Sequence, residues 1–163
     1  MKLIRFGAPG TESPGLQLAD GSRIDASSFG EDYAEAFFAT NGLARLSAWA
    51  AENSATAPRI GAEVRLGPPI TRPSKIICIG LNFSDHAAES GMAVPEEPVV
   101  FFKASSSLVG PNDNLIIPRG SEKTDWEVEL AVVISKRTSY VTEANAMDYV
   151  AGYALHNDYS ERA

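Results

Sequence analysis

The segment from Thr124 to Ile134 constrains the fold more strongly than any other part of the chain. Its apolar and β-branched residues predict a β-strand, in which alternate side chains point to the same face. Glu127 and Glu129 therefore share one face. The other face carries the apolar residues Trp126, Val128, Leu130, Val132 and Ile134. The segment thus predicts a strand with one acidic face and one apolar face.

The two carboxylates on this strand indicate a metal site. They would lie about 6.5–7 Å apart along the strand, where they repel each other and resist removal from water unless a positive charge lies between them. Oxygen ligands suit Mg²⁺, Mn²⁺ or Ca²⁺ rather than Zn²⁺, which usually takes Cys or His. The alternative is a solvated strand face, on which glutamate at alternate positions is common.

The composition is that of an ordinary folded protein. The chain has 163 residues, of which 44% are hydrophobic and 21% charged, enough for one domain or for a small domain plus part of another. The net charge of −7 argues against nucleic-acid binding, which needs basic clusters. Small molecules and metals are the expected partners.

Cysteine usage and hydropathy bear on the compartment. Cys78 is the only cysteine, so an internal disulfide is impossible and a reducing compartment is expected. The sequence has no apolar run of about 18 residues and no signal-peptide pattern at its start. Together these features predict a cytoplasmic protein with no membrane partner.

The first part of the chain predicts a small α+β domain. The expected elements are a strand, a hairpin with an Asp-Gly turn and two helices, at residues 1–6, 15–24, 32–38 and 43–52. A stiff connector rich in proline follows, from Gly67 to Pro73, and it cannot continue a helix. We therefore expect a domain boundary there, with domains at 1–68 and 69–163.

The second part begins with apolar runs. Residues 75–80 and 99–102 predict strands that are buried on both faces, and residues 115–118 predict another strand. Cys78 in the first run is expected to be a small buried hydrophobe rather than a nucleophile.

His86 and Glu89 follow the first apolar run, in a segment that predicts a short helix. At i and i+3 they are neighbours on one helix face. A carboxylate beside an imidazole raises its basicity, which suits a general base that activates water. An ordinary surface His–Glu pair is the alternative.

The last residues offer further polar groups. Asp158 is a candidate third oxygen ligand, and Arg162, four residues on, is a candidate cation for a substrate carboxylate. His156 is expected to be a structural hydrogen-bonding residue rather than a ligand.

Four motifs in a fixed order resemble those of the fumarylacetoacetate hydrolase superfamily, over residues 70–163. They are Ile79-Gly80-Leu81-Asn82-Phe83 with Asp85-His86 and Glu89, Pro98-Val99-Val100-Phe101-Phe102-Lys103, Glu127-Val128-Glu129-Leu130, and Val150-Ala151-Gly152-Tyr153 with Asn157-Asp158 and Ser160-Glu161-Arg162. Within it the sequence is most similar to bacterial acylpyruvate and 2,4-diketo-3-deoxy-sugar-acid hydrolases, some of which are labelled ureidoglycolate lyases.

The resemblance implies an α+β fold: a mixed β-roll preceded by the small N-terminal domain, usually in a homodimer. It implies that Glu127, Glu129 and Asp158 bind Mg²⁺ or Mn²⁺, with Ca²⁺ as a further option. Family members continue well beyond the third metal motif. The resemblance therefore implies that the chain is truncated, with 69–163 forming the first part of the catalytic domain.

The resemblance also implies the remaining site residues. His86 and Glu89 match the water-activating pair, carried on a lid, and Lys103 and Arg162 match positions that line the substrate site. The implied reaction is hydrolysis of a C–C bond in 2,4-diketo acids to pyruvate and a carboxylic acid.

Other reactions remain open. They are those of a ureidoglycolate lyase and of a decarboxylase, hydratase or isomerase acting on 2-oxo acids. A non-catalytic β domain stabilised by Ca²⁺, or a scaffold with no metal, belongs to a different class.

Overall fold

A computed structural model of the protein describes residues 1–89, 91 and 93–163, except for the side chain of His86. The chain divides into two compact units, Met1–Thr71 with Gly110–Ala163 and Arg72–Val109. The first unit contains one three-stranded and two two-stranded sheets, and the second contains one two-stranded sheet. The division into domains 1–68 and 69–163 stays a prediction.

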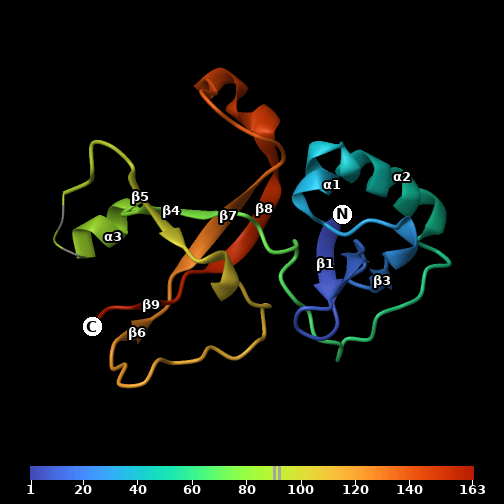
Figure 1. The fold of residues 1–163 in the computed structure, drawn as a ribbon, viewed down its shortest axis with the longest axis horizontal. Coiled ribbons are helices and arrows are strands. Elements are labelled where there is room, and N and C mark those ends of the chain that lie inside the picture. The colour runs from blue at the N-terminus through green and yellow to red at the C-terminus, as the bar shows by residue number, and fades with distance from the viewer. Residues whose placement is uncertain (90, 92) are drawn as a thin grey trace. The chain divides into compact units, whose positions relative to one another are not determined.

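The elements are those of an α+β fold (Figure 1). The strands are β1 Lys2–Phe6, β2 Ser13–Gln17, β3 Arg23–Asp25, β4 Ile76–Gly80, β5 Val99–Lys103, β6 Thr124–Asp125, β7 Val128–Ile134, β8 Val150–Asn157 and β9 Ser160–Glu161. The helices are α1 Glu35–Ala39, α2 Gly42–Asn53 and α3 Ser84–Glu89, with short 3₁₀ helices at Ser27–Phe29, Ser105–Ser107 and Glu143–Tyr149. All strand pairs in the described part of the chain are antiparallel. No described helix reaches the length and hydrophobicity that a membrane crossing requires.

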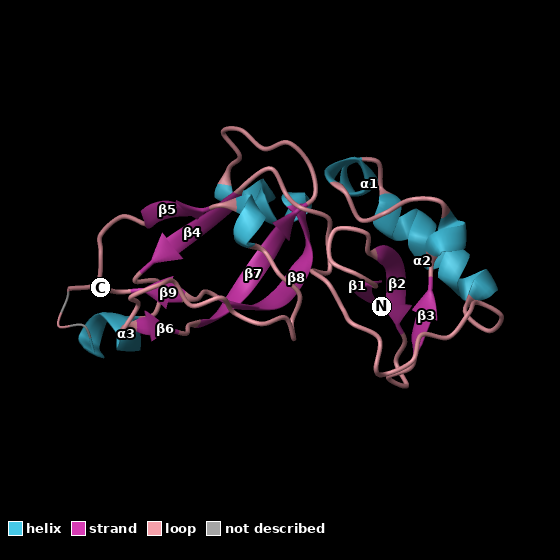
Figure 2. Cartoon of the chain, turned by 60° about the horizontal axis from the view of Figure 1, so that its bottom comes forward, coloured by secondary structure: helices cyan, strands magenta, loops and turns pink. Residues whose placement is uncertain are grey.

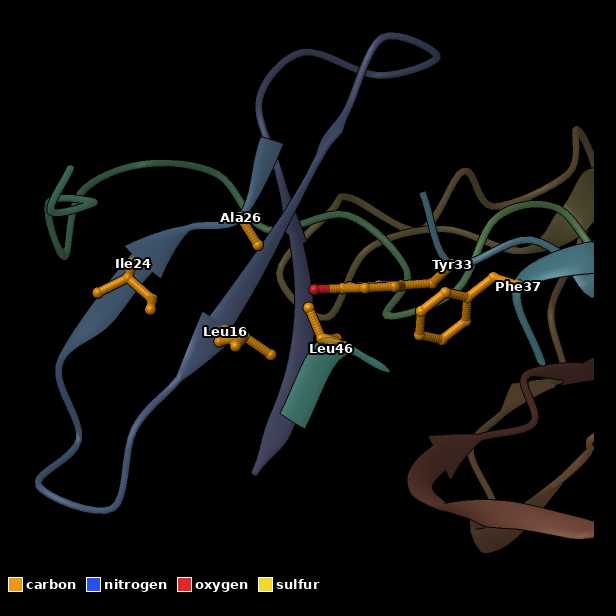
Figure 3. Close-up of a cluster of buried hydrophobic side chains, with 6 residues drawn as sticks. All are labelled: Leu16, Ile24, Ala26, Tyr33, Phe37 and Leu46. Carbon is orange, nitrogen blue, oxygen red and sulfur yellow. The ribbon is translucent and has the colours of Figure 1, made fainter. Parts of the chain in front are cut away.

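The N-terminal elements confirm the predicted strand, hairpin and helices. Strands β1, β2 and β3 form one sheet, and α1 and α2 lie alongside it (Figure 2). The buried core between them consists of Leu16, Ile24, Ala26, Tyr33, Phe37 and Leu46 (Figure 3). The hydroxyl of Tyr33 donates to the carbonyl oxygen of Gly15 at 2.8 Å, so the one polar atom of this cluster is satisfied. Burial raises the pKa of Tyr33 above its usual value, which keeps that donor protonated.

A chain of ion pairs crosses the first unit; we call it the Arg5–Arg65 network. Arg5 donates from two nitrogens to the carboxylate of Asp32, each at 2.8 Å, and lies 3.6 Å from Glu12. Arg65 donates to Glu12 at 3.0 Å and to both carboxylate oxygens of Asp113, at 2.7 and 2.6 Å. Two guanidinium groups therefore alternate with three carboxylates drawn from segments far apart in the sequence.

Strands β7 and β8 lie side by side along their length (Figure 1). Their register pairs Leu130 with Leu155 and Val132 with Tyr153, and all four of these side chains are exposed. Along β7, exposed residues alternate with half-buried ones. The apolar face predicted for this segment is confirmed as one face, and it is open to solvent in the described part of the chain.

The predicted strand from Thr124 to Ile134 is two strands instead of one. Strand β6 ends at Asp125 and β7 begins at Val128, so Trp126 and Glu127 lie between them. Side chains replace the ladder bonds at this break: the N–H of Trp126 donates to the Asp125 carboxylate at 2.9 Å, and that of Glu127 to the amide oxygen of Asn157 at 3.1 Å.

Strands β4 and β5 form as predicted, but the prediction that both are buried on both faces is wrong. Ile77 is 57% exposed and its register partner Phe102 is 65% exposed. Cys78 is buried, as expected for a small hydrophobe. The predicted strand at 115–118 is irregular, because no described strand pairs with it.

Candidate functional site

Three predicted ligands meet at one end of the β7–β8 pair. The backbone N–H of Asp158 donates to the carbonyl oxygen of Glu127 at 2.8 Å, which continues the pairing past the last ladder residues. Glu129 lies opposite His156 in the register. Residues directly opposite one another project from the same face of a sheet. The strand pairing therefore places Glu127, Glu129, Asp158 and His156 together; we call these four residues the acidic end.

Burial distinguishes the acidic end from the apolar face beside it. Asp158 is only 3% exposed, and the side chains of Glu127 and Glu129 are 24% and 26% exposed. Trp126 and Val128, which flank Glu127, are both exposed. The carboxylates are thus partly withdrawn from water, an arrangement that requires positive partners.

Two of these carboxylates, those of Glu127 and Glu129, have nitrogen partners from the chain itself. Arg162 donates from Nε to Asp125 at 2.8 Å and from a terminal nitrogen to Glu127. The Nδ1 atom of His156 lies 3.3 Å from a carboxylate oxygen of Glu129. The bonds to Asp125 and then Glu127 raise the pKa of Arg162, which stays charged.

The acidic end fits a hard divalent cation in two respects. Its donors are oxygens, which Mg²⁺ and Mn²⁺ prefer, and the pairing brings the three carboxylate-bearing residues to the same end of two strands. Glu127 is bonded to Arg162 and Glu129 lies beside His156, however, and no described group of three His, Cys, Asp or Glu side chains is arranged to hold a metal. Binding an ion there would require some of these side chains to change position.

The other predicted site residues belong to the second unit. Helix α3 includes the backbone of His86 and ends at Glu89, which is exposed. The side chain of His86 lies outside the described residues, so the His86–Glu89 pair stays a prediction. Lys103 ends β5, opposite Ile76 in the register. Its role in substrate binding also stays a prediction.

Two residues at this site were not singled out from the sequence. Asp125 anchors Arg162, and the side chain of Asn157 receives the N–H of Glu127. A signal for Asp125 was present, because Asp125, Glu127 and Glu129 occupy three successive alternate positions. Asn157 was quoted only as part of a family motif, and its contact with Glu127 could not be predicted, since it depends on the break in the strand.

Comparison with known proteins gives a family. Residues 75–163, more than half of the chain, match the family described as fumarylacetoacetate (FAA) hydrolase C-terminal. One relative is a protein from Burkholderia multivorans that is provisionally named as a hydrolase. It is 54% identical to this chain over 162 residues, which are 99% of this chain and 56% of the relative. The chain therefore spans slightly more than half the length of the curated relatives that it matches.

Solved structures agree with this match. The chain resembles a maleylpyruvate hydrolase from Sphingobium sp. SYK-6, solved with manganese(II) ion and pyruvate, at 26% identity and a TM-score of 0.79, over 99% of this chain and 60% of that one. It also resembles a 5-carboxymethyl-2-hydroxymuconate delta-isomerase from Mycobacterium smegmatis, at 27% identity and a TM-score of 0.65, over 99% and 55% of the two chains. The chain belongs to the fumarylacetoacetate hydrolase family.

Proposed function

We propose that the protein is a Mg²⁺- or Mn²⁺-dependent hydrolase that cleaves a C–C bond in 2,4-diketo acids, such as acylpyruvates or 2,4-diketo-3-deoxy sugar acids. The observation that carries the proposal is the acidic end. There the backbone N–H of Asp158 donates to the carbonyl oxygen of Glu127, next to the pair of Glu129 and His156. The likeness to a maleylpyruvate hydrolase solved with manganese(II) and pyruvate supports the choice of metal and product.

The acidic residues and the cations have separate roles in this proposal. Glu127, Glu129 and Asp158 would hold the ion, which would supply Lewis-acid chemistry to the substrate. Lys103 and Arg162 donate charge-assisted hydrogen bonds to substrate oxygens and fix the orientation of the molecule.

The His86–Glu89 pair supplies the base. The imidazole of His86 takes a proton from water, and the carboxylate of Glu89 stabilises the resulting imidazolium. The water oxygen bonds to C4 of the substrate and the C3–C4 bond breaks. Its electron pair stays on C3, which takes the proton back from His86. The products are a carboxylic acid and pyruvate, so atoms and charge balance.

Assembly and location complete the proposal. Family likeness supports a homodimer, and the single cysteine of the chain supports a reducing compartment such as the cytoplasm. Its substrate is a small molecule.

The test is a panel of 2,4-diketo acids offered to the purified protein with Mg²⁺. Loss of the enol absorbance together with release of pyruvate, and arrest of both by a chelator, is the expected result. Failure on every diketo acid, with turnover of ureidoglycolate instead, would replace the hydrolase by a lyase.

An isomerase is the second candidate, because one similar solved structure is a delta-isomerase. Isomerisation changes the absorbance of a 2-hydroxydienoate without changing its mass. Mass spectrometry of the products therefore distinguishes the two activities, since the hydrolase adds water and splits the substrate. A non-catalytic calcium domain would bind the metal and turn over none of these compounds.

A further inference from the structure

Arg162 lies at the acidic end as a cation shared between two carboxylates. Its Nε donates to Asp125 at 2.8 Å, and one of its terminal nitrogens donates to Glu127. Strand pairing fixes its position, because Asp125 is opposite Ser160 and the backbone N–H of Arg162 donates to the carbonyl oxygen of Lys123 at 3.1 Å. The guanidinium is therefore held beside Glu127 by its own strand and by Asp125.

This contact places Arg162 in competition with a divalent ion. Glu127 is one of the three carboxylates proposed to bind the metal, and the same carboxylate now accepts a hydrogen bond from Arg162. An ion that takes this same oxygen, Oε1, as its ligand competes with Arg162 for it. The bond to Asp125 uses a different nitrogen and need not break. The guanidinium thus has an anchor on one side and an exchangeable contact on the other.

We propose that Arg162 is an internal counter-cation, which neutralises Glu127 while the acidic end holds no metal and is displaced from it when a divalent ion binds. The inference rests on the proposed metal site. It adds that metal binding costs the free energy of the contact between Arg162 and Glu127. Without Arg162, the carboxylates of Asp125 and Glu127 would repel each other in the metal-free protein. With it, the metal-free protein is more stable and its apparent metal affinity is lower.

Substitution of Arg162 tests the displacement directly. The dissociation constant for Mn²⁺ is measured by isothermal titration calorimetry on the wild-type chain and on Arg162→Gln, with circular dichroism to confirm folding. An exposed Arg–carboxylate contact corresponds to about a two- to five-fold change in an equilibrium constant. We therefore expect Arg162→Gln to bind Mn²⁺ about two- to five-fold more tightly, or more if the removed charge also acts at a distance.

Arg137→Gln is the matched control for net charge. It removes the same charge from the same unit, beyond the far end of β7, a strand of seven residues that spans about 20 Å. Its Mn²⁺ affinity is expected to equal that of the wild type. An equal gain in both variants would mean that overall charge, rather than the contact with Glu127, sets the affinity, and would overturn the inference.

The outcomes separate this inference from the proposed function. Saturable Mn²⁺ binding by the wild type, with no gain in Arg162→Gln, would overturn the inference and leave the proposed metal site standing. Absence of Mn²⁺ binding by the wild type would overturn both.

A second measurement needs no variant. The side-chain Nε–H signal of Arg162 is followed by nuclear magnetic resonance while Mg²⁺, which is diamagnetic, is added. Displacement predicts that this signal shifts along a saturation curve with the calorimetric affinity for Mg²⁺. A signal that does not move at saturating Mg²⁺ would contradict it, even if the Arg162 variant were poorly folded.

Discussion

At the scale of residues, two carboxylates of the acidic end have nitrogen partners from other parts of the chain. Glu127 is bonded to Arg162, and Glu129 lies 3.3 Å from His156. Each contact places a nitrogen donor where a partly buried carboxylate needs one. His156 is therefore a hydrogen-bonding partner of Glu129 in this structure, in agreement with the expectation from the sequence.

The proposed roles of Glu127 and His86 predict different defects. Glu127→Gln removes a metal ligand, so we expect its dissociation constant for Mn²⁺ to rise at least about tenfold. His86→Ala removes the base, so we expect kcat to fall by about 10²–10⁴ with metal affinity unchanged. Calorimetry and the pyruvate assay measure the two effects. Loss of metal affinity in His86→Ala alone would contradict the assignment.

Gly110 predicts a stability effect at a single position. A Cβ there would collide with the carbonyl oxygen of Leu66 and lie 3.1 Å from the Cα of Gly67. These are backbone atoms, which cannot rotate away, so we expect Gly110→Ala to cost about 1–3 kcal/mol of unfolding free energy. Gly152→Ala is the matched control, because a Cβ at Gly152 meets nothing within 4 Å. Equal denaturation midpoints for the two variants would refute the packing argument.

At the scale of elements, the Arg5–Arg65 network joins segments that no hairpin joins. Arg65 lies after α2, just before the connector that begins at Gly67, and Asp113 belongs to the turn that begins at Gly110. The backbone N–H of Gly110 also donates to Asp113, at 2.7 Å. The network therefore fastens the start of the second stretch of this unit to the first.

The contact between Arg65 and Asp113 predicts a contribution to the free energy of unfolding that is lost in acid. Arg65, and after it the N–H of Gly110, hold the pKa of Asp113 below its ordinary value. A depressed pKa in the folded state stabilises the protein above the unfolded pKa, about 4, and the contribution is lost as the pH falls through the folded pKa. Asp113→Asn is expected to reduce stability at pH 7 and to flatten its decline in acid.

Chemical denaturation between pH 7 and pH 2 measures this change, with Asp148→Asn as the control at an exposed position. Arg65→Met should lower stability by about 1–3 kcal/mol, because it removes charge-assisted hydrogen bonds from Asp113 and Glu12. An Asp113→Asn variant that declines in acid as steeply as Asp148→Asn would contradict the role given to this pair.

At the scale of the whole molecule, the open apolar faces are the most prominent feature. Leu155 is 85% exposed and its partner Leu130 is 63% exposed, while β4 and β5 present further apolar side chains in the second unit. Contiguous exposed apolar surface of this kind promotes association. The chain spans slightly more than half the length of its curated relatives.

These faces predict dye binding and association by the purified chain. We expect the 163-residue chain to enhance the fluorescence of an apolar dye and to associate as its concentration rises in sedimentation experiments. Leu130→Gln with Leu155→Gln should weaken both effects, while the same change at buried Leu46 should unfold the N-terminal core instead. A monomer that binds no dye would show that these faces are covered in solution.

The sequence predicted local features better than the environment of each residue. The Asp-Gly turn and the apolar runs were sufficient for the β2–β3 hairpin and for strands β4 and β5, because these signals depend on neighbours in the chain. The exposure of Ile77 and Phe102 was missed, since burial depends on what packs against a strand. The break at Trp126 was missed for a similar reason: it depends on a side chain, Asn157, from another strand.

At the acidic end, too, local features were predicted from the sequence and the contacts between strands were not. Alternation along one segment was enough to place Glu127 with Glu129, and Asp158 was a candidate third ligand that the family resemblance then matched to the metal motif. The partners Arg162 and His156 could not be assigned to these carboxylates, because the register between β7 and β8 has no local signature. Residue types were therefore predictable at the acidic end, while the present orientation of the carboxylates was not.

The central claim is that Glu127, Glu129 and Asp158 bind one divalent ion. Crystals of the protein soaked in Mn²⁺, with diffraction collected to reveal anomalous scattering, test it most directly. The account predicts a manganese peak within ligand distance, about 2.0–2.3 Å, of all three carboxylates, with Arg162 withdrawn from Glu127. A manganese peak elsewhere, or no peak beside these carboxylates at saturating Mn²⁺, would contradict it.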